Sequence, residues 1–387
     1  MKKTMSFLLL ILFTLIVATS EETEAEALLK WKSSLYQSGS LASWAIINST
    51  SPCSWYGISC DPAGNVVQIS LQSSSINGTL DSLNFSYFHN LISLNLNDNI
   101  LQGSIPSGIS NLSKLNSLDL GTNSFGNFVP PEIGDLSELV YLSLFKNNLV
   151  GPVPFQLSRL SKLRHFDLGH NHLNNTDYSN FTAMSSVLYL SLFQNNLTGV
   201  FPQFILKCTN LTYLDLSQNG FFGPIPDSVA NLSMLRELHL GTNNFIGGIP
   251  SVLSSISDLR VLELGNNSLG GPLPFSLSQL KFLERLDVKY AGMNSTIPHE
   301  LGLCTNLNFI NLSFNQLSGQ LPFTFVNLTK MREFDISNNN LSGEILGEFF
   351  KSWIELNDFK VQNNSLTGRI PPEIGLAKKL TGIHSVA

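Results

Sequence analysis

Residues 211–226, with the sequence LTYLDLSQNGFFGPIP, decide how the whole chain folds. Leu214 and Leu216 alternate with polar residues, which is the pattern of a short strand that buries one face. Asn219 follows where this strand should end, and an amide that both donates and accepts can satisfy backbone groups at a turn. We therefore expect a short strand followed by a turn built on Asn219.

This phrase returns every 24 residues, so the chain is an array of repeats. The turn asparagine recurs at Asn99, Asn123, Asn147, Asn171, Asn195, Asn219, Asn243 and Asn267, and then at Asn315, Asn339 and Asn364. Ser74 in the opening repeat and Ala291 in the ninth interrupt the series, and one residue is inserted before Asn364. Stacked strands with this period predict a parallel sheet on the concave side of a solenoid.

The second half of the phrase, Gly-x-Ile-Pro or a close variant, also recurs. It stands at residues 103–106, 151–154, 199–202, 223–226, 247–250, 271–274, 319–322 and 368–371. This piece resembles the plant-specific subclass of leucine-rich repeats, over about residues 65 to 380, and the resemblance implies a second short strand on one flank. Residues 174–186, NNTDYSNFTAMSS, contain neither Gly nor Pro, so we expect an irregular convex loop there.

The resemblance implies an α/β solenoid, a right-handed superhelix with an N-terminal helical cap and a parallel concave sheet. Its expected parts are a signal peptide in 1–20, a cap in 21–64, about twelve to thirteen repeats in 65–379 and a truncated final repeat in 380–387.

The N-terminal segment predicts export. Lys2 and Lys3 precede the apolar run from Phe7 to Val17, and small residues permit cleavage after Ser20. No later apolar run approaches the ~20 residues that span a bilayer, so we expect a secreted chain without an anchor. Glycosylation sequons agree with export, at Asn48, Asn77, Asn84, Asn111, Asn174, Asn180, Asn196, Asn210, Asn231, Asn266, Asn294, Asn311, Asn327, Asn340 and Asn363.

The segment after residue 20 predicts a cap for the first repeat. Thr23 and Glu26 have capping-box spacing, and Leu28, Trp31 and Leu35 fall on one helical face. The run ALLKWKSSL, followed by LASW and CSWYGISCD, resembles the N-terminal capping domain of plant leucine-rich-repeat receptors.

The four cysteines divide into two kinds. Cys53 and Cys60 lie close together in a chain bound for an oxidising compartment, so we expect a disulfide between them. Cys208 and Cys304 stand in the same phrase, CTNL, four periods apart, too distant to pair, and we expect two buried thiols.

Composition and motifs exclude several classes of protein. The formal net charge is −6 and only 13% of residues are charged, without any basic cluster, so nucleic-acid binding is not expected. The chain lacks the GxSxG, P-loop, HExxH and GxGxxG motifs. His165, His170 and His172 gather in one repeat beside Asp167, but a solvated face explains them better than a metal or acid–base site. We expect neither an enzyme nor a cofactor or metal.

Function should therefore lie on the exposed strand positions, where aromatic and charged residues replace small polar ones. The candidate ligand-binding residues are Tyr141, Phe145, His165, Tyr189, Phe193, Tyr213, Glu237, His239, Glu263 and Arg285. Farther along lie Asp287, Lys289, Tyr290, Phe309 and Phe314. The recurring aspartates of the LDL-like phrases are interpreted as a solvated column, at Asp119, Asp167, Asp215, Asp287 and Asp335.

The whole chain resembles the ectodomain of a plant leucine-rich-repeat receptor-like kinase, of the male-discoverer-interacting type. The resemblance implies recognition of a secreted peptide on the concave face, at the cell surface or outside the cell, with a leucine-rich-repeat co-receptor and an intracellular Ser/Thr kinase. The chain contains no kinase and ends inside a repeat, so we expect a form truncated relative to the family.

The alternative is a secreted leucine-rich-repeat inhibitor of cell-wall-degrading enzymes. Such inhibitors carry additional cap cysteines, which this chain lacks. The genomic sequence beyond codon 387 distinguishes the two, because a receptor continues into a membrane span and a kinase.

Overall fold

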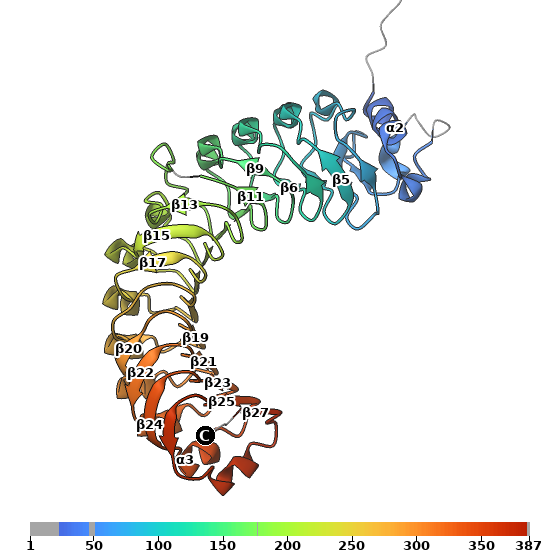
Figure 1. The fold of residues 1–387 in the computed structure, drawn as a ribbon. Coiled ribbons are helices and arrows are strands. Elements are labelled where there is room, and N and C mark those ends of the chain that lie inside the picture. The colour runs from blue at the N-terminus through green and yellow to red at the C-terminus, as the bar shows by residue number, and fades with distance from the viewer. Residues whose placement is uncertain (1–22, 46–50, 176, 385–387) are drawn as a thin grey trace, which may run out of the picture.

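The computed structural model describes residues 23–45, 51–175 and 177–384, and it forms an arc of stacked coils (Figure 1). The predicted signal peptide and Asn48 lie outside these residues. Within the described part, no helix has both the length and the apolar character needed to span a bilayer.

The concave side of the arc is one 15-stranded sheet. Its first two strands are antiparallel, and each later strand pairs in parallel with the strand of the next coil. The expected solenoid with a parallel concave sheet is confirmed. In spatial order the strands are β1 (Ile58–Cys60), β2 (Val66–Ser70), β4 (Ser93–Asn95), β6 (Ser117–Asp119), β8 (Tyr141–Ser143), β10 (His165–Asp167), β12 (Tyr189–Ser191), β14 (Tyr213–Asp215), β16 (Glu237–His239), β18 (Val261–Glu263), β19 (Arg285–Asp287), β21 (Phe309–Asn311), β23 (Glu333–Asp335), β25 (Asp358–Lys360) and β27 (Gly382–His384).

Short strands on one flank form separate small sheets, as the recurring Gly-x-Ile-Pro piece predicts. The first two comprise β3 (Asn77–Gly78), β5 (Ile100–Gly103) and β7 (Ser124–Phe125), and then β9 (Val150–Gly151) and β11 (His172–Leu173). The third comprises β13 (Thr198–Gly199), β15 (Gly220–Pro224) and β17 (Asn244–Ile246). The fourth comprises β20 (Asn294–Thr296), β22 (Gln316–Gly319), β24 (Asn340–Glu344) and β26 (Ser365–Thr367).

Short helices return the chain across the convex side. Most are single 3₁₀ turns that begin directly after or at a proline, whose fixed φ suits the first helical position. They are η4 (Phe85–Tyr87), η5 (Ser107–Asn111), η6 (Pro131–Asp135), η7 (Phe155–Arg159), η8 (Ile205–Lys207), η9 (Asp227–Asn231), η10 (Ser251–Ser255), η11 (Phe275–Gln279), η12 (His299–Leu303), η13 (Phe323–Asn327), η14 (Pro372–Leu376) and the α-helix α3 (Gly347–Ser352).

The coil that follows β11 has no convex helix among its described residues, in agreement with its irregular sequence. Aromatic packing replaces the helix, because the rings of Phe181 and Phe204 stack with centroids 4.8 Å apart and Tyr178 packs against both. The amide of Thr182 also donates to the Ser158 hydroxyl in the neighbouring coil.

The N-terminal cap consists of α2 (Glu24–Ser34), η1 (Gly39–Leu41) and η3 (Pro52–Ser54). Thr23 and Glu26 form the predicted capping box, and Leu28 and Trp31 are fully buried. Leu35 lies just past the end of α2 and is only partly buried. The indole of Trp31 donates to the Thr79 carbonyl, which fixes the cap to the first repeats.

The structure separates the cysteines as expected. Cys53 and Cys60 form a disulfide, which confirms that prediction. Cys208 and Cys304 are buried free thiols, and burial raises the pKa of both.

The recurring asparagines bind each coil to the coil before it. Asn219 Nδ2 donates to the Leu216 carbonyl oxygen of its own coil (3.2 Å) and to that of Leu192 in the preceding coil (2.9 Å). Its Oδ1 accepts the amide of Leu197, also in the preceding coil (3.1 Å). The same contacts recur at Asn147, Asn171, Asn195, Asn243 and Asn339. We call this series the asparagine ladder.

Ala291 interrupts the asparagine ladder. Its coil lacks the side-chain donor, and the Leu269 amide lacks the acceptor that its counterpart Leu197 has. Asn315 of the next coil keeps its own ladder contact, because its Oδ1 accepts the Met293 amide, and the same oxygen also accepts the Ala291 amide.

Removing one ladder side chain should be costly. Asn219→Ala leaves buried backbone groups without partners and should lower the free energy of unfolding by ~1–3 kcal/mol. Gln218→Asn is the matched control, because Gln218 has φ of 53° and Asn tolerates that conformation. The control should change stability by no more than ~0.5 kcal/mol. Equal shifts in urea unfolding would contradict the ladder.

Restoring the missing side chain should have the opposite effect. Ala291→Asn places a donor and an acceptor where the other coils have them, and should raise the free energy of unfolding by about 0.5–1.5 kcal/mol. Denaturant unfolding of the variant beside the parent measures the change. A loss of stability would show that this coil does not provide the geometry of the others.

Candidate functional site on the concave sheet

Parallel pairing aligns the concave side chains in columns. Tyr141, His165, Tyr189 and Tyr213 are register partners on β8, β10, β12 and β14. Successive ring centroids are 4.3 Å apart, and the planes differ by 8°, 11° and 10°. These four candidate residues therefore form one continuous stack, which we call the aromatic row.

The ring faces of the aromatic row are covered by stacking within the row. Each ring between the two ends has a neighbour on both faces, so a ligand meets ring edges and hydroxyl groups. Phe145 and Phe193, two positions beyond the strands β8 and β12, are half-buried beside the row. Phe145 packs edge-on against His170, with ring centroids 6.0 Å apart.

A second column runs beside the aromatic row and contains the recurring aspartates. The solvated-column interpretation is wrong for Asp215 and Asp287, whose exposed fractions are 8% and 7%. Each carboxylate accepts a backbone amide two residues on, as Asp215 does from Ser217 (2.8 Å) and Asp167 does from Gly169 (2.8 Å). The aspartates therefore hold the turn that leaves each strand, and Tyr213 covers Asp215 by donating its hydroxyl to it (3.3 Å).

Burial shifts the pKa values of residues in the aromatic row and of the aspartate beside it. It raises the pKa of Asp167 to about 6, although the Gly169 amide and the Ser191 hydroxyl oppose the change. It also lowers the pKa of His165 to about 4 and raises that of Tyr189 to about 12. At neutral pH the row is therefore uncharged above a column of carboxylates.

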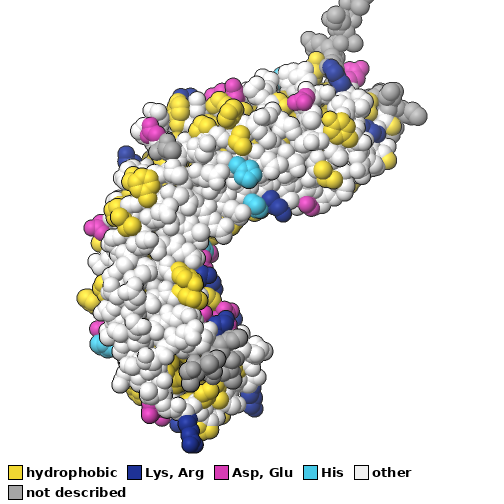
Figure 2. All heavy atoms as spheres, viewed as in Figure 1, with side chains coloured by type: hydrophobic (Ala, Val, Ile, Leu, Met, Phe, Trp, Pro, Cys, Tyr) yellow, Lys and Arg dark blue, Asp and Glu magenta, His cyan; other side chains and the backbone are white. Residues whose placement is uncertain are grey.

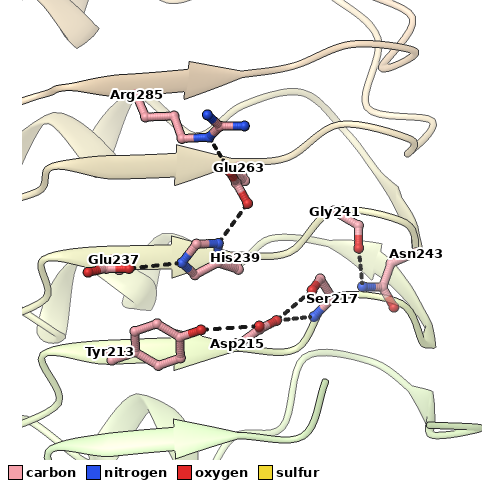
Figure 3. A network of polar contacts seen from close by, with 9 residues as sticks. All are labelled: Tyr213, Asp215, Ser217, Glu237, His239, Gly241, Asn243, Glu263 and Arg285. Carbon is pink, nitrogen blue, oxygen red and sulfur yellow. Dashed lines mark hydrogen bonds and ion pairs between the residues drawn. The ribbon is translucent and has the colours of Figure 1, made fainter. Parts of the chain in front are cut away.

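The next four candidate residues form a charged network (Figure 3). His239 Nδ1 lies 2.7 Å from Glu263 and its Nε2 lies 3.3 Å from Glu237. The Arg285 guanidinium pairs with Glu263 and lies over the Phe309 ring, 3.4 Å from its centroid. Tyr213 packs against His239, so the network continues the aromatic row.

The contacts within the charged network set its charges. Hydrogen bonding to His239, together with Arg285, lowers the pKa of Glu263 to about 2. Burial opposes the charge on His239, but Glu263, Asp215 and Glu237 outweigh it and raise its pKa. The network thus presents paired charges at the middle of the sheet.

The three clustered histidines do not converge on one site. His165 belongs to the aromatic row, His170 stands on the turn after β10, and His172 lies in β11 on the flank. Among the described residues, no group of three His, Cys, Asp or Glu side chains is placed to hold a metal ion.

Sequence reasoning missed a hollow beside the charged network, with a volume of about 130 Å³. It is lined by Ser217, Gln218, Gly241, Thr242, Glu263, Gly265, Asn266, Asp287 and Lys289. A side chain at Gly265 would collide with Asp287, since a Cβ there would lie 2.9 Å from its Oδ1. Glycine at this repeat position, Gly241 and then Gly265, is the sequence signal that marks the hollow.

Family models identify the repeats. The leucine rich repeat N-terminal domain matches residues 21–61, and models of the leucine rich repeat match 161–221 and 90–112, 258–280, 306–328 and 330–352. The chain is therefore built of leucine-rich repeats. The described residues of this leucine-rich-repeat chain form a cap and repeats, with no kinase domain among them.

Its relatives include plant receptor kinases. RGI4, a leucine-rich repeat receptor-like serine/threonine-protein kinase of Arabidopsis thaliana, is 40% identical over 123 residues, which are 32% of this chain and 11% of that protein. MDIS1-interacting receptor like kinase 2 of the same plant is 38% identical over 104 residues, 27% of this chain and 10% of its own length.

A solved structure extends the likeness over most of the repeats. The crystal structure of PEPR1–AtPEP1 matches with a TM-score of 0.83 and 29% identity over 93% of this chain and 51% of that chain. The leucine-rich-repeat chain thus spans about half of the solved chain, and its matches span about a tenth of the curated relatives.

The acidity of Asp167 gives a pH test of the site. Because its folded-state pKa of about 6 lies above the ordinary 3.8, the charged form destabilises the fold above pH 6, and this penalty fades as the pH falls toward 3.8. Asp167→Asn should therefore raise the melting temperature at pH 7 and have less effect at pH 4.

Two comparisons isolate this effect. Protonation of His165 acts with the opposite sign, but it is common to parent and variant, so their difference reports Asp167. Asp227→Asn, at an exposed position of η9, should change the melting temperature little at either pH. A difference for Asp167→Asn that does not vary with pH would contradict the burial argument.

Proposed function

We propose that the chain is the extracellular ligand-binding domain of a plant receptor-like kinase and that it recognises a secreted peptide on its concave face. The observation that carries this is the likeness to the solved structure of the plant peptide hormone receptor RGFR1 in complex with RGF2, which covers 86% of this chain and 60% of that chain at 31% identity with a TM-score of 0.68. The finer assignment to the male-discoverer-interacting type has the support of the likeness to MDIS1-interacting receptor like kinase 2.

The proposed contact surface consists of the aromatic row with its flanking Phe145 and Phe193, and of the charged network. Stacked ring edges and tyrosine hydroxyls suit an extended peptide, whose apolar side chains and backbone groups can approach them together. A carbohydrate would need free ring faces, and the inner rings of the row have none. The geometry therefore favours a peptide over a glycan as the ligand.

The rest of the receptor belongs to the same proposal. A leucine-rich-repeat co-receptor would join the complex, and a kinase beyond this chain would carry the signal, as the kinases named among the relatives suggest. The predicted signal peptide and glycosylation sequons support a location outside the cell or at its surface.

Selection from a random peptide library tests peptide recognition. The full chain, secreted from plant or insect cells and immobilised, is panned against phage that display random 12-residue peptides, and individual enriched peptides are then titrated. Tyr189→Ala and Tyr213→Ala should each weaken their binding by about tenfold, which is the ~1–2 kcal/mol expected of a tyrosine contact. Tyr189→Phe keeps the stack and should retain more affinity.

Tyr36→Ala is the matched control, because Tyr36 lies in the cap with an exposed fraction of 72% and loses the same atoms. It should leave peptide binding unchanged. Failure to enrich any peptide, or enriched peptides that bind all the variants equally, would overturn the proposal. Tight binding of a cell-wall-degrading enzyme in place of a peptide would support the inhibitor alternative.

A further inference from the structure

Two large aromatic residues project from the rim of the concave face. Tyr290 and Phe314 occupy equivalent turns after β19 and β21, and their rings stack with centroids 4.0 Å apart and an interplanar angle of 11°. Their exposed fractions are 50% and 42%. Figure 2 shows a hydrophobic patch on the inner edge of the lower half of the arc, beside charged side chains. We call Tyr290 and Phe314 the rim pair.

The backbone conformation of the rim pair is costly. Both residues are left-handed, with φ of 48° and 54°, a region that bulky side chains seldom occupy. Other coils place polar residues at this turn, namely Asp98, Thr122, Lys146, His170, Gln194, Gln218, Thr242, Asn266, Asn338 and Asn363. The left-handed turn recurs in the other coils, and the rim pair differs from them in carrying two bulky aromatic side chains that stack on each other at the surface. Such costly residues at an exposed turn point to a function.

The coil of Tyr290 also lacks a stabilising contact to the preceding coil. Ala291, the next residue, is the position where the asparagine ladder is interrupted. Backbone strain and a missing cross-coil contact thus fall on adjacent residues. The coils that flank the rim pair have polar residues at this turn, Asn266 and Asn338, and they keep the ladder contacts of Asn267 and Asn339.

The hollow leads from the coil of Tyr213 to the rim pair. It begins at Ser217 and Gln218, passes Gly241 and Gly265, and ends at Lys289, beside Tyr290. Ser217, Gly241, Gly265 and Lys289 are the same repeat position in four successive coils, so the hollow runs straight along the turns. The lining is polar, and the glycines keep it free of side chains.

We propose that the rim pair is a second anchor for the same peptide, and that the hollow receives small polar side chains of the segment between the two anchors. This inference rests on the proposed function. It defines the ligand class as an extended peptide with two apolar residues separated by small, polar residues. A bulky residue in the middle would not fit a polar hollow of about 130 Å³.

The separation of the anchors sets the length of the linking segment. Tyr213 and Tyr290 lie three coils apart, which is roughly 14 Å at ~4.8 Å per strand. Tyr213 lies four residues before Ser217, where the hollow begins, and this adds roughly 13 Å across the sheet at ~3.3 Å per residue. The path from Tyr213 through the hollow to Tyr290 is therefore roughly 27 Å, which an extended peptide spans with about eight residues.

Continuity favours the peptide over a partner protein at the rim pair. Tyr290 directly follows Lys289, which lines the hollow, and the two residues of the rim pair lie in the coils of Arg285 and Phe309. A peptide seated on the aromatic row crosses from Tyr213 to Ser217 and then follows the hollow to the rim pair. A partner protein would contact the rim pair without needing the hollow.

Asparagine variants of the rim pair provide the test. Tyr290→Asn and Phe314→Asn introduce the residue that the flanking coils have at Asn266 and Asn338, so they should fold at least as stably as the parent. The probes are 12-residue peptides enriched from the random phage library on the parent chain. Each rim variant should weaken their binding by about tenfold, and shortened peptides that lack one apolar end should no longer respond to the rim variants.

Three results would overturn the inference. Unchanged peptide affinity in both rim variants, while Tyr189→Ala still weakens binding, would remove the second anchor and leave the proposed function intact. A glycan at the Asn266 sequon, detected by mass spectrometry of the secreted chain, would cover the hollow and exclude the path. Loss of a protein partner alone, with peptide binding retained, would assign the rim pair to that partner. Failure to enrich any peptide would instead refute the proposed function itself.

Discussion

The whole architecture depends on one side-chain amide per coil. In Asn219 and its equivalents, a single group donates to carbonyl oxygens of two coils and accepts an amide of the earlier one. These contacts fix the distance and the register between neighbouring coils, because a shifted coil would leave several buried backbone groups without partners. The concave columns follow directly, and the stacking of Tyr141, His165 and Tyr189 at 4.3 Å is close to the ~4.8 Å between strands.

This alignment has a chemical consequence for the concave face. Identical positions in successive coils are forced into contact, so a run of aromatic residues must stack and a run of carboxylates must share a low-dielectric space. The raised pKa of Asp167 and the lowered pKa of Glu263 are two outcomes of one geometry. Asp167 lies among other carboxylates under the aromatic row, whereas Glu263 has His239 and Arg285 on either side.

The sequence alone predicted the features of the fold that follow from the repeat period. The spacing of Asn219 and its equivalents predicted the coils and the sheet, and the alternation around Leu214 predicted which faces are exposed. It did not predict the burial of Asp215 and Asp287, because that burial comes from side chains of neighbouring residues and coils that lean over the carboxylates. The sequence also did not predict that Glu263 pairs with both His239 and Arg285, because the repeat pattern does not tell which of these basic side chains contacts it. The hollow was missed because it consists of absent side chains.

The interruption at Ala291 has a mechanical meaning. The flank sheets also break in this region, between β17 and β20, where only isolated bridges at Ser268 and Pro272 connect the coils. Two independent series of cross-coil hydrogen bonds are therefore thinned at the same place, so fewer bonds resist bending there. The aromatic row lies on one side of this position and Phe314 on the other. Bending at this position changes the distance between the aromatic row and Phe314, so the curvature of the arc determines the length of peptide that can contact both.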